Sequence, residues 1–349
     1  LTPNQDTLET LMAKSGGSAG IYGYRIDTSE IVLSTSLVQL LILSIAIITA
    51  AAIQRRHSSM HATISESLSK SSSQPPTRPA KITIFVGLLF AITPMLMVVI
   101  ASFRVRNRGS TDTEFTNSAW LEALSGDYST TPIPEALSNS LVYCLITLAV
   151  ALPTGWIISS CIARLERENR LKTAQLVEFG TMIPLALSAV MIGLGILLGL
   201  LKWSPNLFNW AFIPAIPHII ITTPFVIRIL LPAIRSLDVT YYEQAMMLGL
   251  GPLKAWWHGK AAFLRAPLVV AGALTMAFSL GEFGASWVLI RSGSWDTLSV
   301  LIDQLMSQPK FNPLIQPMAM AAATVLMVLT FTLFFIAEKF RDNSEGSGF

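Results

Sequence analysis

The feature of this sequence that most constrains its fold is a series of long apolar runs. The hydrocarbon core of a bilayer takes about 20 apolar residues as a helix. Seven runs reach that length: Ile31–Ile53, Ile82–Phe103, Ala136–Ala163, Ala174–Leu201, Ala211–Ile234, Pro267–Ile290 and Pro313–Ala337. Only 13% of the residues are charged, against about 25% in an ordinary soluble domain. We therefore predict an all-α polytopic membrane protein, and an ordinary cytosolic enzyme or a disordered chain is excluded.

The charge balance and the cysteines narrow the class further. The formal net charge is +3, and the sequence lacks the concentrated basic face that binding to nucleic acid requires. Cys144 and Cys161 lie in one apolar run. If that run is one helix, they are roughly 25 Å apart, which is too far for a disulfide. We expect both to be free thiols.

The distribution of Lys and Arg predicts the orientation of the runs. Most of these residues fall on the cytoplasmic side if the segment after the first run and the C-terminus are both placed there. The cluster of Arg104, Arg106 and Arg108 runs against this rule, because it lies on the outer side. Residues 58–80 are rich in Ser and Pro, which indicates a flexible cytoplasmic linker. The linker separates one lone span from a six-span unit at 81–341, and residues 342–349 form a cytoplasmic tail.

An internal repeat offers an explanation of the lone span. The sequence DTLETLMAK begins at Asp6 and DTLSVLIDQ begins at Asp296, and each is followed by one apolar run and a basic exit. We interpret residues 1–57 as the tail and last transmembrane span of an earlier homologous unit. Leu1 is not an initiator Met, so we expect a fused tandem that lacks most of its first half.

The polar loop at 236–265 reads as two short helices joined by a turn. Asp238 suits the N-cap of the first helix, Gly249 and Gly251 can end it, and Pro252 suits the first turn of the second. We expect this hairpin to lie against the membrane on its cytoplasmic side. The residues alone are also compatible with a plain amphipathic hairpin that lies at the membrane interface and binds no partner.

The same loop carries a resemblance. Glu243-Gln244-Ala245 followed by Gly249 resembles the EAA-x-x-x-G loop of binding-protein-dependent ABC importer permeases. SLGEFGAS, from Ser279, and the TLSVLIDQL segment resemble the thiamine and ferric-iron branch, which commonly fuses two six-span units. The chain departs from the family at Gln244, where Ala is usual. It also has Gly259, Ala261 and Ala262 where Ile or Val and then Leu-Pro are usual.

The resemblance implies the transmembrane permease component of an ATP-driven importer, with ferric iron or thiamine as substrate. Its implied partners are two copies of an ATP-binding subunit, an extracytoplasmic substrate-binding protein, the missing homologous permease half and the lipid bilayer. Its implied location is the bacterial inner membrane. The implied ATPase-coupling loop contains these residues: Glu243, Gln244, Ala245, Gly249 and Pro252.

The sequence also lacks the motifs of several other chemistries. It contains no GxxxxGK followed by Ser or Thr, so it has no P-loop of its own and a separate subunit must hydrolyse ATP. We expect no enzyme activity, no cofactor and no metal site, because its four histidines are scattered and its sequence has no nucleophile elbow. An ion-gradient-driven secondary transporter remains the alternative function, and a membrane-bound enzyme ranks last.

Glu282 is the ionisable residue that stands out within the apolar runs, and such residues are functional candidates. It could line a pathway for a cationic substrate, or it could hold the bundle together through hydrogen bonds to Ser279 and Ser286. Gly281 and Gly284 beside it could let a neighbouring helix approach closely. We favour packing, and in either case we expect Glu282 to face the bundle core or the interface between units and not lipid. Two other ionisable residues, Arg228 and Glu178, are expected to snorkel or pair.

Overall fold

The computed structural model describes residues 34, 35, 37–39, 41, 42, 45, 49, 78–106, 113–126, 131–204, 206, 207, 210–237, 239–257, 261–290, 295–309 and 311–345. The first copy of the repeat, residues 58–77 of the linker and Asp238 lie outside these residues. Only scattered positions of the first apolar run are described, so the interpretation of residues 1–57 stays a prediction.

The described part of the six-span unit consists of these helices and strands, in chain order. They are α3 (Arg78–Phe103), β1 (Arg104–Arg106), β2 (Thr113–Phe115), α4 (Ser118–Ser125), α5 (Ile133–Arg167), α6 (Leu171–Met182), the 3-10 helix η2 (Ile183–Ala186), α7 (Ala189–Trp203), α8 (Ala215–Ser236), α9 (Val239–Met247), α10 (Pro252–Trp256), α11 (Ala262–Gly281), α12 (Gly284–Leu289), α13 (Leu298–Ser307) and α14 (Ile315–Glu345). The all-α prediction is confirmed, and among the described residues one short antiparallel hairpin, β1–β2, adds to the helices.

Among the described residues, five helices are long and apolar enough to cross a membrane: α3, α5, α8, α11 and α14. A sixth span would be the bent pair formed by Leu171–Ala186 and α7, whose axes differ by 94°. The break has a local cause, because Pro184 has no amide hydrogen for the helix ladder and Ser188 adopts an extended conformation. The run predicted at Pro267–Ile290 is also interrupted, since α11 ends at Gly281.

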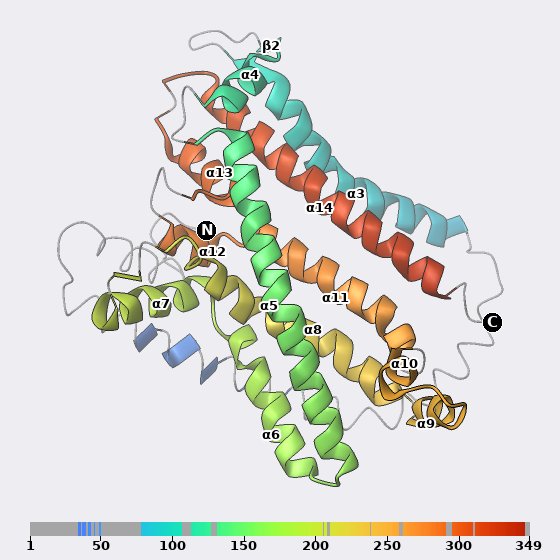
Figure 1. The fold of residues 1–349 in the computed structure, drawn as a ribbon. Helices are drawn as coiled ribbons and strands as arrows, with labels where there is room; N and C mark the ends of the chain where they lie inside the picture. The colour runs from blue at the N-terminus through green and yellow to red at the C-terminus, as the bar shows by residue number, and fades with distance from the viewer. Residues whose placement is uncertain are drawn as a thin grey trace.

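The long helices form one bundle with α5 crossing its middle (Figure 1). The helix α5 packs on α8 and α11, α11 packs on α8 and α14, and α3 runs beside α14. The contact of α5 with α8 depends on Gly155, because a Cβ there would lie 2.5 Å from Cγ1 of Val226. The bundle therefore requires a residue without a side chain at this crossing.

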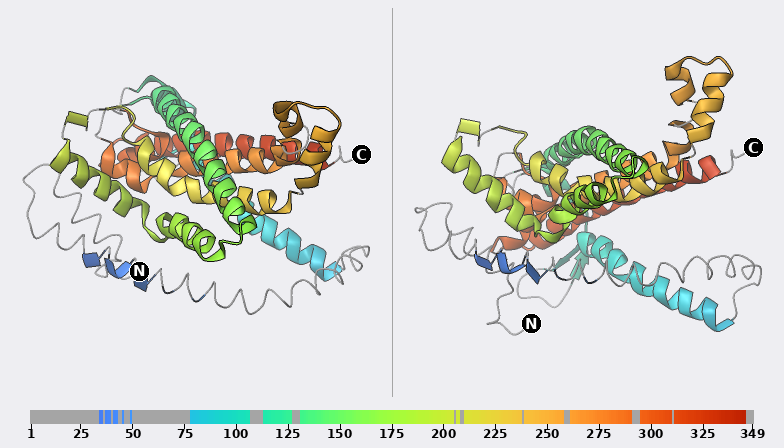
Figure 2. Two further views of the ribbon diagram at one scale, coloured as in Figure 1. Left: turned by 60° about the horizontal axis from the view of Figure 1, so that its bottom comes forward. Right: turned by 90° about the horizontal axis from the view of Figure 1, so that it is seen from below.

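The two ends of the bundle differ. The hairpin β1–β2, α4 and α13 gather at one end, and α9 and α10 stand away from the bundle at the other (Figures 1 and 2). At the hairpin end, apolar side chains of α4, α5, α13 and α14 form one buried cluster; towards the other end, α5, α6, α8 and α11 form a second. The span of α3 is described throughout, and no residue in its most apolar part is buried within the chain.

The second copy of the repeated DTL sequence anchors α13 to α5. Asp296 is buried, and its carboxylate accepts hydrogen bonds from the Thr131 hydroxyl at 2.7 Å and from Gln304 at 3.1 Å. Thr297 is the N-cap of α13, and the amide of Leu298 donates to the Ser140 hydroxyl at 2.9 Å. This copy therefore has a structural role at the hairpin end.

Candidate functional site

The turn between α9 and α10 is built by one glycine. The amide of Leu250 donates to the carbonyl of Ala245 at 3.2 Å, and the amide of Gly249 donates to that of Met246 at 3.0 Å. This pair of bonds is the Schellman motif that ends a helix on a left-handed residue. Gly249 has φ +82° and no neighbouring atom within 4 Å of its Cβ position. Glycine is therefore required by the backbone conformation and not by lack of space.

The tip of this α9–α10 loop (residues 239–257) exposes large apolar side chains. Met247 is 88% exposed and Leu248 is 83% exposed. Glu243 and Gln244 are exposed on the same helix, whereas Ala245 is buried against the turn. Exposed apolar side chains surrounded by polar ones are typical of interaction surfaces.

The other side of the loop is fastened to the bundle by tryptophans. Trp256 on α10 lies 5.9 Å from Trp156 on α5, measured between ring centroids, and 6.2 Å from Trp257. The guanidinium of Arg265 lies 5.8 Å from the centre of the Trp257 ring, a cation–π distance. Because α10 contacts α5 directly, a displacement of the loop would act on the central helix of the bundle.

The departures from the family pattern lie just after this loop. Ala261 is buried, and Ala262 begins α11, which continues through Pro267. Gly259 and His258 lie outside the described residues. The structure therefore places the start of α11 in the region where the family usually has Leu-Pro.

An ion network joins three helices at the same end of the bundle. The Arg235 guanidinium on α8 donates to both carboxylate oxygens of Glu166 on α5, at 2.9 and 2.6 Å, and to Glu178 on α6 at 2.8 Å. Such a two-pronged contact fixes geometry as well as charge. Glu178 is thus paired, and Arg228 is exposed.

Glu282 lies inside the bundle, in the break between α11 and α12. Its Oε1 accepts a hydrogen bond from the amide of Ala285 at 2.8 Å, and its Oε2 accepts from the amide and the hydroxyl of Ser286 at 3.1 and 2.8 Å. The backbone carbonyl of Glu282 accepts from the Ser299 hydroxyl at 2.9 Å. The carboxylate therefore satisfies the first amides of α12, as an anion at a helix N-terminus should.

His218 on α8 completes this buried cluster. Its Nε2 lies 3.1 Å from Oε2 of Glu282 and 2.8 Å from the Ser286 hydroxyl, while its Nδ1 is hydrogen-bonded to the Ser279 hydroxyl at 2.8 Å. The ring is 1% exposed and is arranged edge-to-face with Tyr143. A protonated imidazole would pair with the carboxylate. The cluster thus links α8 to both halves of the broken span.

The two glycines beside Glu282 differ. A Cβ on Gly284 would lie 3.0 Å from Val190 on α7, and one on Gly193 would lie 2.9 Å from Ala285. These positions allow α12 and α7 to touch. Gly281 is exposed and has no atom of the described chain within 4 Å of its Cβ position, so a close helix approach at Gly281 stays a prediction.

His218 received no role in the prediction from sequence, which treated the four histidines as scattered. It lies 64 positions from Glu282 in the sequence, and no local pattern marks the pair. The expected partner Ser286 does bind Glu282, but Ser279 binds His218 instead. Within the described part of the chain, no three His, Cys, Asp or Glu residues gather as a metal site would require.

Comparison with known proteins identifies the fold of the chain. No protein-family model matches the sequence. In the crystal structure of a bacterial ABC transporter that imports the acidic polysaccharide alginate, one chain aligns with a TM-score of 0.54 and 15% identity, covering 76% of this chain and 99% of that one. The chain has the fold of an ABC importer permease.

Relatives agree with the fold. The chain is 25% identical to sulfate permease 2 of the Chlamydomonas reinhardtii chloroplast, over 59% of this chain and 56% of that protein. It is 27% identical to the sulfate transport system permease CysW of Escherichia coli, over 57% and 70%. It is 25% identical to a Salmonella paratyphi A protein named as a 2-aminoethylphosphonate transport permease, PhnV, over 62% and 78%. The aligned region thus spans little more than half of the algal relative.

These relatives are permease components of ABC transporters, which are transport proteins and not enzymes. Together with the apolar helices, they support a multi-pass inner-membrane protein. They are sulfate and phosphonate permeases, and so they support the importer class but not the thiamine and ferric-iron branch.

Proposed function

We propose that this chain forms part of the translocation pathway of an ATP-driven importer and that its α9–α10 loop docks on a separate ATP-binding subunit. The observation that carries the proposal is the loop itself: a glycine-specified turn, an exposed apolar tip and a tryptophan contact with α5. A loop that merely joined α8 to α11 would need none of the three.

The two sides of the loop suit two tasks. Met247 and Leu248 are exposed and would offer apolar surface to a groove on the partner. Glu243 and Gln244 supply polar contacts beside them. Trp256 and Trp156 pass a displacement of the loop to α5, and the Arg235 network holds α5, α6 and α8 together at that end.

The partners follow from the same proposal. Two copies of the ATP-binding subunit would act on two homologous permease units, one of them at 81–341. Residues 236–265 and the C-terminal residues 342–349 would face the cytoplasm, and an extracytoplasmic binding protein would deliver the substrate. Residues 1–57, as the last span of an earlier unit, would precede the linker at 58–80. No residue in the most apolar part of α3 is buried within the chain, which supports burial of this surface against lipid or a second unit.

The substrate belongs to this proposal as well. Ferric iron and thiamine are the candidates that the sequence resemblance implies. The names of the relatives add sulfate and 2-aminoethylphosphonate, both of which carry tetrahedral oxyanion groups. A thermal-shift panel of these four compounds on the cognate binding protein distinguishes them, since binding raises the melting temperature of that protein.

Gly249→Val tests the docking function, and Gly251→Val is its matched control. Both glycines have open space around the Cβ position, but only Gly249 has positive φ. A left-handed backbone costs an ordinary residue about 1–2 kcal/mol, and more for a β-branched one. We expect Gly249→Val to abolish assembly with the ATPase or substrate-stimulated ATP hydrolysis, while Gly251→Val retains both.

Normal assembly and stimulated ATP hydrolysis by the Gly249→Val complex would contradict the proposal. Uptake that continues without ATP and stops when the ion gradient is collapsed would favour the alternative, a secondary transporter.

A further inference from the structure

The arginines that run against the charge rule are placed together by the hairpin. Arg104 and Arg106 lie two residues apart on β1, and Arg106 pairs with Thr113 of β2. Alternate residues of a strand share a face, so both arginines are on the face opposite Val105 and Glu114. Nothing in the proposed transport function calls for two cations here.

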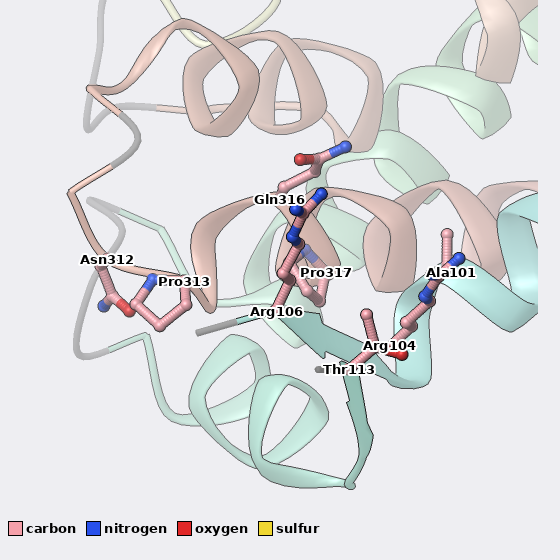
Figure 3. A pocket seen from close by; sticks show the side chains of 8 residues that line it. All are labelled: Ala101, Arg104, Arg106, Thr113, Asn312, Pro313, Gln316 and Pro317. Atoms are coloured by element: carbon pink, nitrogen blue, oxygen red, sulfur yellow. The ribbon is translucent and has the colours of Figure 1, made fainter. Parts of the chain in front are cut away.

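This face borders a cavity of about 410 Å³ between the hairpin and the start of α14 (Figure 3). Its eight lining residues are Ala101, Arg104, Arg106, Thr113, Asn312, Pro313, Gln316 and Pro317. None of these eight is acidic. In Figure 3 the Arg106 side chain runs from β1 towards Gln316 on α14.

The polar lining residues can donate hydrogen bonds. The Asn312 Oδ1 atom accepts from the amide of Leu314 at 3.0 Å, which leaves its Nδ2 as the group that can donate to a ligand. Gln316 and Thr113 add a carboxamide and a hydroxyl. Two guanidinium groups with such donors match the oxygens of a phosphate or sulfate group.

The level of the cavity relative to the membrane indicates the source of such a phosphate or sulfate group. Arg104 follows Phe103, the last residue of the α3 span, and the α14 span begins at Ile315. The cavity therefore lies where two membrane-spanning helices leave the hydrocarbon core, at the level of the lipid headgroups. The exposed apolar side chains of Leu96, Met97 and Ile100 lie on α3 before the cavity, so acyl chains can lie along this part of the helix.

We propose that this cavity binds a tetrahedral oxyanion, supplied by the headgroup phosphate of an anionic phospholipid. A free phosphate or sulfate ion has the same chemistry and is the other possible source. The site needs the chain to lie in a membrane, but it does not depend on ATPase docking, so the two proposals can fail separately.

The test measures lipid binding to the purified full chain by native mass spectrometry in detergent. The probes are phosphatidylglycerol, phosphatidylcholine, inorganic phosphate and sulfate. The test variant is Arg104→Gln/Arg106→Gln. The control is Lys202→Gln/Lys339→Gln, which removes two exposed positive charges from the ends of α7 and α14. Thermal melting of each variant shows whether it is folded, and the two single arginine variants replace the double if it is not.

We expect the double arginine variant to bind phosphatidylglycerol on the order of tenfold more weakly, as the loss of about one charge-assisted contact would give. The lysine control should bind as the unaltered chain does, and phosphatidylcholine should bind more weakly to all of them. If free phosphate or sulfate binds in an arginine-dependent way and phosphatidylglycerol does not bind, the cavity is an oxyanion site whose ligand is the free ion. Equal binding by the arginine and lysine variants, or no binding of any probe, would overturn the proposal.

Discussion

Replacing Glu282 by Gln should destabilise the protein far more than the same replacement at Glu178. Both residues carry a carboxylate with bonded partners: Glu178 lies on α6, and Glu282 lies between α11 and α12. Glu282 is 9% exposed and is held by Ala285, Ser286 and His218. Glu178 is about one-third exposed and pairs with Arg235 at 2.8 Å. The same Glu→Gln replacement at the two sites therefore compares a buried carboxylate with a solvated one.

The magnitude follows from the contacts that are lost. A glutamine amide can accept at one oxygen only, so the amide of Ala285 or of Ser286 loses its acceptor, at a cost of about 1–3 kcal/mol. Loss of the contact with His218 adds the net contribution of one further hydrogen bond, about 0.5–1.5 kcal/mol. We expect a total of about 1.5–4.5 kcal/mol for Glu282→Gln, against about 0–1 kcal/mol for Glu178→Gln.

The assay is thermal unfolding of the purified complex, combined with a double-mutant cycle on the buried pair. At about 2–4 °C per kcal/mol, Glu282→Gln should lower the melting temperature by roughly 3–18 °C. The cycle of Glu282→Gln with His218→Asn should show a coupling energy of about 1–3 kcal/mol. Equal melting temperatures for the Glu282 and Glu178 variants, or strict additivity in the cycle, would refute the reasoning.

The same variants distinguish packing from a pathway role. If Glu282 only holds the bundle, the transport rate per intact complex should not change in Glu282→Gln. A slower rate for a cationic substrate, with unchanged stability, would instead place the carboxylate in the pathway.

Two further predictions concern packing. Gly155→Ala should cost about 1–3 kcal/mol, because its Cβ would press on Val226, and adding Val226→Ala should recover part of the lost melting temperature; an unchanged melting temperature in Gly155→Ala would contradict the close crossing. Thr131→Val should cost about 1–3 kcal/mol, because the buried carboxylate of Asp296 loses a donor. Thr154→Val removes only an exposed hydroxyl bonded within its own helix and should melt as the unaltered chain does, so similar losses in the two threonine variants would contradict the buried role of Thr131.

The apolar runs predicted the spans because membrane insertion depends on local composition. Five runs of the six-span unit contain a described helix that meets the length and hydropathy of a span. The breaks were harder to predict. The run from Ala174 to Leu201 is largely apolar, yet Pro184 and the extended Ser188 bend it by 94°. Composition cannot show such a bend, since a broken span is as apolar as a straight one.

The α9–α10 loop could be predicted in more detail, because turn chemistry is local. Gly249 and Pro252 together specify where one helix ends and the next begins. The buried cluster could be predicted only in part. Burial of Glu282 follows from the cost of a carboxylate in lipid, but its contact with His218 depends on how α8 packs against α11, which no local pattern records.

The row of indoles at the α9–α10 loop has a spectroscopic consequence. Trp156, Trp256 and Trp257 are spaced 5.9 and 6.2 Å apart, and neighbouring rings are inclined by 44° and 48°. Chromophores this close and not parallel couple their excited states, which gives paired bands of opposite sign in circular dichroism. If the loop shifts relative to α5, the coupling between Trp156 and Trp256 falls steeply with distance. Although the chain has eight tryptophans, this coupled signal would report the seating of the loop without any label.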